Sequence, residues 1–344
     1  MRGPLPTVGD LPAASVYIRP LGWPAGDFHE VVVRGAVPAK ATVDEIRAWA
    51  DGRDAAVATR VETLLERLAA PPRNFAGLPL GRPLVMGIVN VTPDSFSDGG
   101  ETPDPASAIE RGRAMAAAGA RIVDVGGEST RPGSRTVSLE EELERVVPVV
   151  RALAADGLVV SIDSRRAAVL GAALEAGAAI VNDVTALNGD PASLDLVAKS
   201  GAPVILMHML GEPGTMQDDP RYDNAPLDIY DYLAERVATC EAAGIERARI
   251  AVDPGIGFGK TVAHNAEILG RLGLYHGLGC VVVLGASRKS FIGRLSQDEP
   301  AQGRIPGSLA AALAGAAQGV QIIRVHDVAE THQALAIWEA IRIA

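Results

Sequence analysis

The stretch LVMGIVN, residues 84–90, is a short apolar run that ends on Asn90, a side chain able to donate and accept hydrogen bonds. Unbroken runs of Val, Ile and Leu with this length are typical of strands buried on both faces of a parallel sheet. The pattern recurs seven more times, each run ending at a polar or charged tip, at residues 121–123, 158–162, 179–181, 203–207, 249–252, 281–285 and 321–323. The sequence therefore predicts eight buried strands.

Segments rich in Ala and Leu, with helical spacing, separate these runs. They cover residues 105–118, 139–154, 165–175, 191–200, 227–243, 265–272 and 307–318. A strand followed by a helix, repeated around eight strands, predicts an α/β fold of the (β/α)8 TIM-barrel type. Catalytic groups of that fold lie at the C-terminal ends of the strands, so we expect the polar tips to meet at one mouth.

The chain of 344 residues is longer than a usual barrel of about 250, and its first predicted strand begins only at Leu84. We therefore predict a small α+β extension, residues 1–80, packed on a barrel of residues 81–344. Within the extension, residues 17–19 and 31–34 are candidate strands. Residues 54–69 form a candidate helix, because Val57, Val61, Leu64, Leu65 and Leu68 share one face.

Composition excludes some classes of partner. A net charge of −10 disfavours a nucleic-acid partner, which needs a basic face, although a locally basic pocket still suits a small anion. We see no signal peptide and no apolar stretch of about 18 residues, so we expect no membrane partner and a cytoplasmic location. We expect Cys240 and Cys280 to be buried thiols rather than a disulfide.

Two loops at the predicted mouth are candidate functional segments. Residues 90–100 and 126–134 are rich in glycine and hydroxyl side chains and are longer than a packed connection needs. In the second loop, Arg131 could clamp an anion. The alternative is that both are ordinary surface turns.

Three strand tips are suited to a flat heterocycle. Asp163, Asn182 and Asp253 follow different strands, and a carboxylate can accept two parallel N–H donors while a carboxamide both donates and accepts. Each of them could instead cap a helix, because Asp and Asn are favoured at that position. Three caps at three strand ends are less expected than one binding site.

The remaining tips point to an aromatic group and an anion. Residues 253–260, DPGIGFGK, lack the spacing of a phosphate-binding P-loop, and Phe258 is a candidate platform for an aromatic substrate. Residues 287–290 and 324–326 lie where barrels commonly hold phosphate. His208 is either a metal ligand or a hydrogen-bonded core residue, and the second interpretation is favoured because no cluster with metal-ligand spacing surrounds it.

Taken together, these segments resemble the dihydropteroate synthase family, which joins a pterin to p-aminobenzoate. The resemblance runs from about residue 84 to residue 343, with its motifs in the family's order. They are MGIVNVTPDSFSDGG, VDVGGESTRPGS, SIDS, IVNDV, LMHM followed by GEPGTMQ, DPGIGFGK, ASRKS and IIRVHD. Residues 1–80 lie outside it.

The resemblance implies roles for individual residues. It implies a pterin site made of Asp163, Asn182, Asp253, Lys289 and Arg324. It implies that Asn90 binds Mg²⁺ together with the diphosphate, whose oxygens also contact Arg324 and His326. It implies a p-aminobenzoate pocket made of Thr130, Arg131, Pro132, Phe258 and Ser290, closed by Phe96, Ser97 and Asp98.

The same resemblance assigns the reaction itself to Asn90, Asp98, Lys289, Arg324 and His326, and it implies a homodimer. The expected chemistry is loss of diphosphate from the pterin methylene, followed by attack of the arylamine, with no protein nucleophile. Two alternatives stay open: a methyltetrahydrofolate:corrinoid methyltransferase, which has no use for a diphosphate site, and a pterin-binding homologue without activity.

Overall fold

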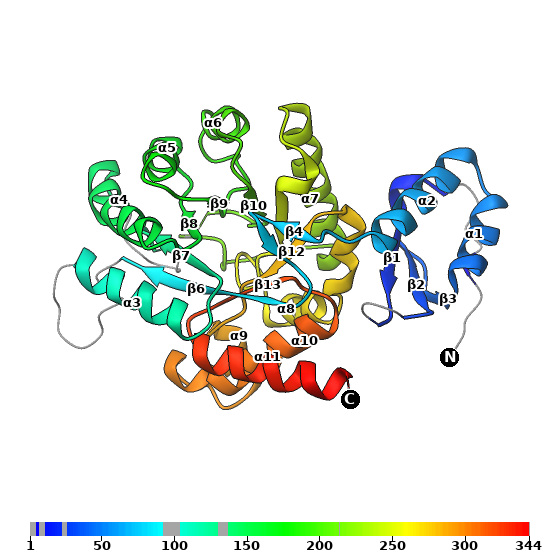
Figure 1. Cartoon of the computed structure of the whole chain (residues 1–344). Helices are drawn as coiled ribbons and strands as arrows, with labels where there is room; N and C mark the ends of the chain where they lie inside the picture. Colours follow the sequence, from blue (N-terminus) through cyan, green and yellow to red (C-terminus); the bar gives the residue numbers. More distant parts are fainter. Residues whose placement is uncertain are drawn as a thin grey trace.

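A closed barrel of eight parallel strands forms the centre of the molecule (Figure 1). The computed structural model describes residues 5–6, 11–22, 26–91, 104–129, 137–212 and 214–343. The barrel strands are β6 (Leu84–Asn90), β7 (Ile122–Gly126), β8 (Val160–Asp163), β9 (Ile180–Asp183), β10 (Val204–Met207), β11 (Ile250–Asp253), β12 (Val281–Leu284) and β13 (Ile322–Val325). Each predicted run contributes one strand, and the pairing of β13 with β6 closes the barrel. The predicted TIM barrel is confirmed.

Helices follow the strands and cover the outside of the barrel. They are α3 (Pro105–Ala117), α4 (Leu139–Ala155), α5 (Ala167–Glu175), α6 (Ser193–Ser200), α7 (Ala225–Ala242), α8 (Val262–Leu269), α9 (Ser290–Leu295), α10 (Ile305–Ala317) and α11 (Val328–Ile343). The predicted helix at residues 265–272 is wrong at both ends. A capping box at Thr261 starts α8 earlier, and Leu272 opens the 3₁₀ helix η4 (Leu272–Leu278). The segments α9 and α11 were not predicted.

The barrel interior is filled by alternate residues of the strands. Because side chains of a strand alternate between its two faces, every second residue points to the barrel axis. The interior cluster contains Leu84, Met86, Ile122, Ile180, Ile205, Ala251, Val281, Val283 and Ile322. A hairpin of β4 (Asn74–Phe75) and β5 (Leu78–Pro79) adds Phe75 and Leu78 to the same cluster. The hairpin therefore closes the N-terminal end of the barrel.

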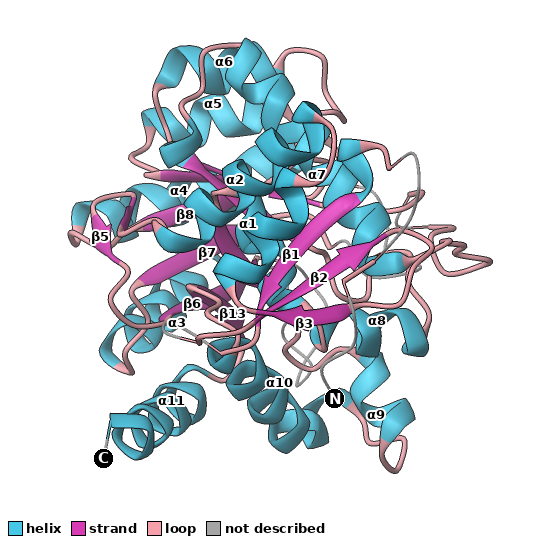
Figure 2. Cartoon of the chain, turned by 90° about the vertical axis from the view of Figure 1, so that its right-hand side faces the viewer, coloured by secondary structure: helices cyan, strands magenta, loops and turns pink. Residues whose placement is uncertain are grey.

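The chain before the hairpin forms a separate small unit (Figure 2). An antiparallel sheet of β1 (Val16–Pro20), β2 (His29–Val33) and β3 (Ala39–Ala41) is covered by α1 (Val43–Asp51) and α2 (Ala55–Ala69). Thr42 and Asp54 cap the two helices. The five residues expected on one face of α2 are all buried. We refer to residues 11–69 of this unit as the extension.

The extension packs on the barrel at α7 and η4, and all seven residues of η4 are buried. Cys240 and Cys280 are free and buried. None of the helices in the described ranges is long and apolar enough to cross a membrane.

We predict that Leu64→Ala in α2 lowers the free energy of unfolding by about 2–5 kcal/mol, because it leaves a cavity in a fully buried position. Denaturant unfolding followed by circular dichroism measures the change. Leu295→Ala is the control, since that leucine is 61% exposed and should shift stability by no more than about 0.5 kcal/mol. Equal effects of the two substitutions would contradict the docked arrangement of α2.

Candidate functional site

A layer of polar side chains lies directly above the apolar interior of the barrel. In β7, β9 and β13, the residue two positions after an interior isoleucine is Asp124, Asn182 or Arg324. Strand alternation therefore points all three to the barrel axis at the mouth. In β11, Asp253 follows the interior residue Ala251 in the same way. We call the set Asp124, Asp163, Asn182, Asp253 and Arg324 the polar layer.

Arg324 links two carboxylates of the polar layer. Its Nε lies 2.6 Å from Asp124 Oδ2, and its Nη2 lies 2.6 Å from Asp163 Oδ2. The Asn182 side-chain amide donates to Asp124 Oδ2 (3.2 Å). A carboxylate bound to a guanidinium at this distance is a strong, oriented acceptor. Four strands thus contribute to one connected network.

Asp124 is the member of this network to which the sequence interpretation gave no role. It is fully buried, and its Oδ1 has no hydrogen-bond partner among the described residues. A buried acceptor without a partner is costly unless a ligand or water satisfies it. The signal was present in the sequence, because Asp124 ends the second apolar run as Asp163 ends the third.

Burial is the largest cause of the raised pKa values of Asp163 and Asp253. Burial raises the pKa of Asp163 to about 7, although the charge of Arg324 opposes this shift. Burial also raises the pKa of Asp253, against the hydrogen bond from the Gly255 N–H and the positive charges of Lys289 and Arg324. The local cations therefore oppose, without cancelling, the effect of burial on the pKa of both groups.

Two glycines shape the chain around Asp253. Gly255 adopts a φ of +68°, and a Cβ there would lie 1.9 Å from the His208 carbonyl oxygen, so no other residue fits this turn. The Gly255 N–H donates to Asp253 Oδ1 (2.7 Å). At Gly285, a Cβ would lie 3.5 Å from Asp253 Oδ2 and 3.9 Å from Arg324 Cδ. At Gly285, the backbone therefore lies close to both the Asp253 carboxylate and the Arg324 side chain.

Phe258 and Lys289 lie together beside this space. The Lys289 ammonium is 3.9 Å from the centroid of the Phe258 ring, a cation–π contact. A Cβ on Gly257 would come within 3.1 Å of Lys289 Cδ. The predicted pterin residue Lys289 and the predicted aromatic platform Phe258 are therefore neighbours, whereas Ser290 is exposed at the start of α9.

His208 and Lys260 form a buried pair beneath the platform. Lys260 Nζ lies 3.0 Å from His208 Nδ1 and donates to the Phe258 carbonyl oxygen (2.9 Å). Burial, with the Lys260 charge, lowers the pKa of His208 to about 2, so His208 is neutral. No group of three or more potential metal ligands occurs within the described ranges. The hydrogen-bonded core interpretation of His208 fits these contacts.

In the predicted anion site, the Ser287 hydroxyl contacts His326. Ser287 Oγ lies 3.1 Å from His326 Nδ1 and accepts from the His326 N–H (3.2 Å). Arg288 adopts a φ of +58° and pairs with Asp327, so its guanidinium is already engaged by a carboxylate. Ser287 and His326 therefore come together, whereas Arg288 contributes to the fold.

Asn90 ends β6 and is paired in register with Gly126, which in turn is paired with Asp163. It lies on the same edge of the barrel as the polar layer. Other predicted site residues lie outside the described residues: Phe96, Ser97, Asp98, Thr130, Arg131 and Pro132.

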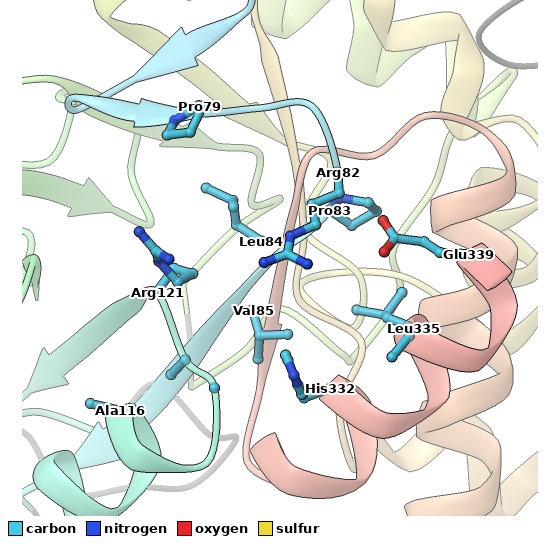
Figure 3. A pocket seen from close by; sticks show the side chains of 13 residues that line it. Pro79, Arg82, Pro83, Leu84, Val85, Ala116, Arg121, His332, Leu335 and Glu339 are labelled. Atoms are coloured by element: carbon cyan, nitrogen blue, oxygen red, sulfur yellow. The ribbon is translucent and has the colours of Figure 1, made fainter.

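A cavity of about 350 Å³ lies at the other end of the barrel (Figure 3). Its lining includes Arg82, Leu84 and Arg121 before or at the first residues of the strands, and His332 and Leu335 of α11. It contains no residue of the polar layer. Because barrel enzymes place their chemistry at the C-terminal ends of the strands, this cavity is not the candidate active site.

Comparison with known proteins shows the family of this chain. A family model described as pterin binding enzyme matches residues 86–326. Dihydropteroate synthase from Escherichia coli (strain K12) is 48% identical over 264 residues, which cover 76% of this chain and 93% of that protein. The Neisseria meningitidis serogroup B enzyme of the same name is 46% identical over 269 residues, covering 77% and 94%.

Solved structures of dihydropteroate synthases are also similar to this chain. Yersinia pestis dihydropteroate synthase in a sulfonamide drug complex aligns with a TM-score of 0.74 at 48% identity, covering 78% of this chain and 97% of that one. Xanthomonas albilineans dihydropteroate synthase with 4-aminobenzoic acid gives 0.75 at 46% identity, covering 80% and 100%. The Xanthomonas enzyme in complex with 7,8-dihydropteroate gives 0.71 at 44% identity, covering 78% and 96%.

We predict that Asp163→Asn weakens binding of a pterin analogue by about 1.5–3 kcal/mol, because a neutral oxygen replaces a charged acceptor. The raised pKa of Asp163 adds a pH dependence. The carboxyl becomes protonated as pH falls through about 7, so wild-type affinity should decrease from about pH 8 to about pH 6. Calorimetry at both pH values measures this, and the variant should lose the dependence. Unchanged affinity in the variant would remove Asp163 from the site.

We predict that Asp124→Asn lowers the free energy of unfolding by about 3–5 kcal/mol and weakens pterin binding, because it removes the fully buried one of the two carboxylates that pair with Arg324. Denaturant unfolding and calorimetry test both effects. Asp195→Asn is the matched control. Its ion pair with Lys199 is exposed, with side-chain exposures of 76% and 81%, so its loss should cost less than about 1 kcal/mol.

Proposed function

Since this chain belongs to the dihydropteroate synthase family of pterin-binding enzymes, we propose that it joins 6-hydroxymethyl-7,8-dihydropterin diphosphate to p-aminobenzoate, giving 7,8-dihydropteroate and diphosphate in folate biosynthesis. The observation that carries this proposal is the polar layer, where Arg324 connects Asp124 and Asp163 at the barrel mouth. The family resemblance noted in the sequence is confirmed.

The polar layer supplies the hydrogen bonds that a pterin edge requires. The free Oδ1 of Asp124 and the carboxylates of Asp163 and Asp253 accept from the ring and exocyclic N–H groups. Asn182 offers a carbonyl oxygen as well as its amide, so it complements an edge with both donors and acceptors. Lys289, beside the Phe258 ring, directs a donor to the same space. The flat Arg324 guanidinium lies against the face of the ring.

The reaction breaks the bond between the pterin methylene carbon and the diphosphate oxygen, and the electron pair leaves with the diphosphate. The arylamine lone pair then forms the new C–N bond, and the nitrogen loses a proton. Lys289, Arg324 and His326 stabilise the negative charge that develops on the leaving group. Asn90 and Asp98 complete the set to which we assign the reaction. No protein nucleophile takes part.

Asn90 fits a Mg²⁺ ion that is shared with the substrate. Mg²⁺ commonly binds one or two protein oxygens together with substrate phosphates and waters, so one carboxamide oxygen next to a diphosphate is a sufficient protein donor. When bound, the ion neutralises diphosphate charge.

The second substrate lies nearer the solvent. Phe258 supports its ring, and Ser290 with Thr130, Arg131 and Pro132 completes the pocket. A homodimer and a cytoplasmic location belong to the same proposal. Ile337 and Ile341 on α11 are 59% and 72% exposed and offer apolar surface to a second copy. Neither the methyltransferase nor the inactive homologue has an observation in its favour.

We predict that steady-state turnover of the purified protein requires both substrates and Mg²⁺, with one dihydropteroate formed per diphosphate. A coupled diphosphate assay, with product measured by chromatography, tests this. Lys289→Met should lower kcat/KM by about 10²–10³, the effect of removing one group that stabilises developing charge. Leu295→Ala should be unaffected. Absence of turnover in the wild-type protein would refute the proposed function.

A further inference from the structure

The extension is anchored to α7 by a charged cluster that is unrelated to the polar layer. Tyr17 is fully buried, and its hydroxyl lies 3.0 and 2.9 Å from the two carboxylate oxygens of Asp231. Arg34, directly after β2, binds Asp228 (2.6 Å) and Asp231 (2.8 Å). Arg34 therefore connects the extension to two acidic residues one helical turn apart on a barrel helix.

Aromatic side chains of β1, α7 and η4 also pack together where the extension meets the barrel. Tyr17 meets Tyr230 of α7 edge-on, with ring centroids 5.3 Å apart, and Tyr230 stacks on Tyr275 of η4 at 6.4 Å. Arg67 of α2 donates to the Gly277 carbonyl oxygen (3.1 Å). Figure 1 shows the extension beside α7, on the flank of the barrel. The extension is thus a rigid support for α7 rather than a tethered module.

Asp228 links Arg34 to the first residues of α7. One carboxylate oxygen binds Arg34, and the other accepts the Asn224 N–H (3.0 Å). Asn224 is the N-cap of α7, where its side chain accepts from the Leu227 N–H. Arg34 therefore holds the residue at which the chain enters α7 from the loop after β10.

That loop holds the turn around Phe258. The Tyr222 hydroxyl donates to the Gly259 carbonyl oxygen (2.8 Å), and the Gln217 amide donates to the Gly257 carbonyl oxygen (2.6 Å). Gly257 and Gly259 flank Phe258 and have φ values of +82° and +63°. Glycines impose little conformational restriction, so these two hydrogen bonds restrict the platform.

We propose that the extension positions the arylamine subsite, with Arg34 as the positioning residue that acts through Asp228, Asn224 and Tyr222 on Phe258. This inference rests on the proposed function. The polar layer lies on barrel strands and does not depend on this support, whereas the proposed pterin residue Lys289 lies at the N-cap of α9 and contacts the Phe258 ring. Loss of Arg34 therefore loosens the p-aminobenzoate platform while the polar layer stays intact.

The test compares Arg34→Met with Arg47→Met in steady-state kinetics of the full chain. Arg47 lies in the same extension and forms an ion pair with Glu62, which is also a residue of the extension. Both side chains are exposed, and this ion pair does not join the extension to the barrel. Arg34→Met should raise the KM for p-aminobenzoate at least about five-fold, the lower end of a typical coupling, with kcat and the KM for the pterin substrate within about two-fold. Arg47→Met should match the wild type.

Tyr222→Phe keeps the proposal falsifiable if Arg34→Met folds poorly, because it removes only the hydroxyl that binds Gly259. It should give the same selective rise in KM, and the double variant should show less than the product of the two single effects. An unchanged KM for p-aminobenzoate in both variants, an equal rise in both KM values, or fully multiplicative effects would overturn the inference. A wild type without turnover would instead refute the proposed function.

Discussion

The ion pairs of Arg324 with Asp124 and Asp163 are the interaction on which the barrel mouth depends. Asp124, Asp163 and Asp253 point into one space, and burial there raises the pKa of Asp163 to about 7 and also raises the pKa of Asp253. One guanidinium on β13 opposes this effect of burial and fixes Asp124 and Asp163 in orientation. The site can therefore accept several N–H donors at once, which is what distinguishes a pterin edge from most small molecules.

The two proposed substrate sites lie on different kinds of backbone, one on strands and one on a turn. The polar layer lies on strands, where the hydrogen bonds of the sheet fix each backbone position. Phe258 lies on a turn with three glycines of positive φ, Gly255, Gly257 and Gly259. Hydrogen bonds from Lys260 and from the loop after β10 hold this turn. Under the proposed assignments, the first substrate meets a preorganised surface, and the geometry of the second depends on contacts far from the chemistry.

Much of the fold could be predicted from sequence because parallel strands are buried on both faces and so leave unbroken apolar runs. The same runs located Asp163, Asn182 and Asp253 at one mouth. Asp124 also follows one of these runs, but its role depends on contacts with Arg324 and Asn182, which lie far away in the sequence. The contacts of Tyr17 and Arg34 with α7 could not be predicted, because they join residues some 200 positions apart and no local pattern encodes them. Short elements such as β3 and α9 carry too few residues to show a period.

The hairpin of Phe75 and Leu78 gives the barrel the shape of a well with a sealed base. Molecules that occupy such a well are stacked, and the one beneath cannot leave while another sits above it. Under the proposed function, the heterocycle bound at the polar layer enters first, and the arylamine enters above it. The joined product would then leave with its arylamine end first.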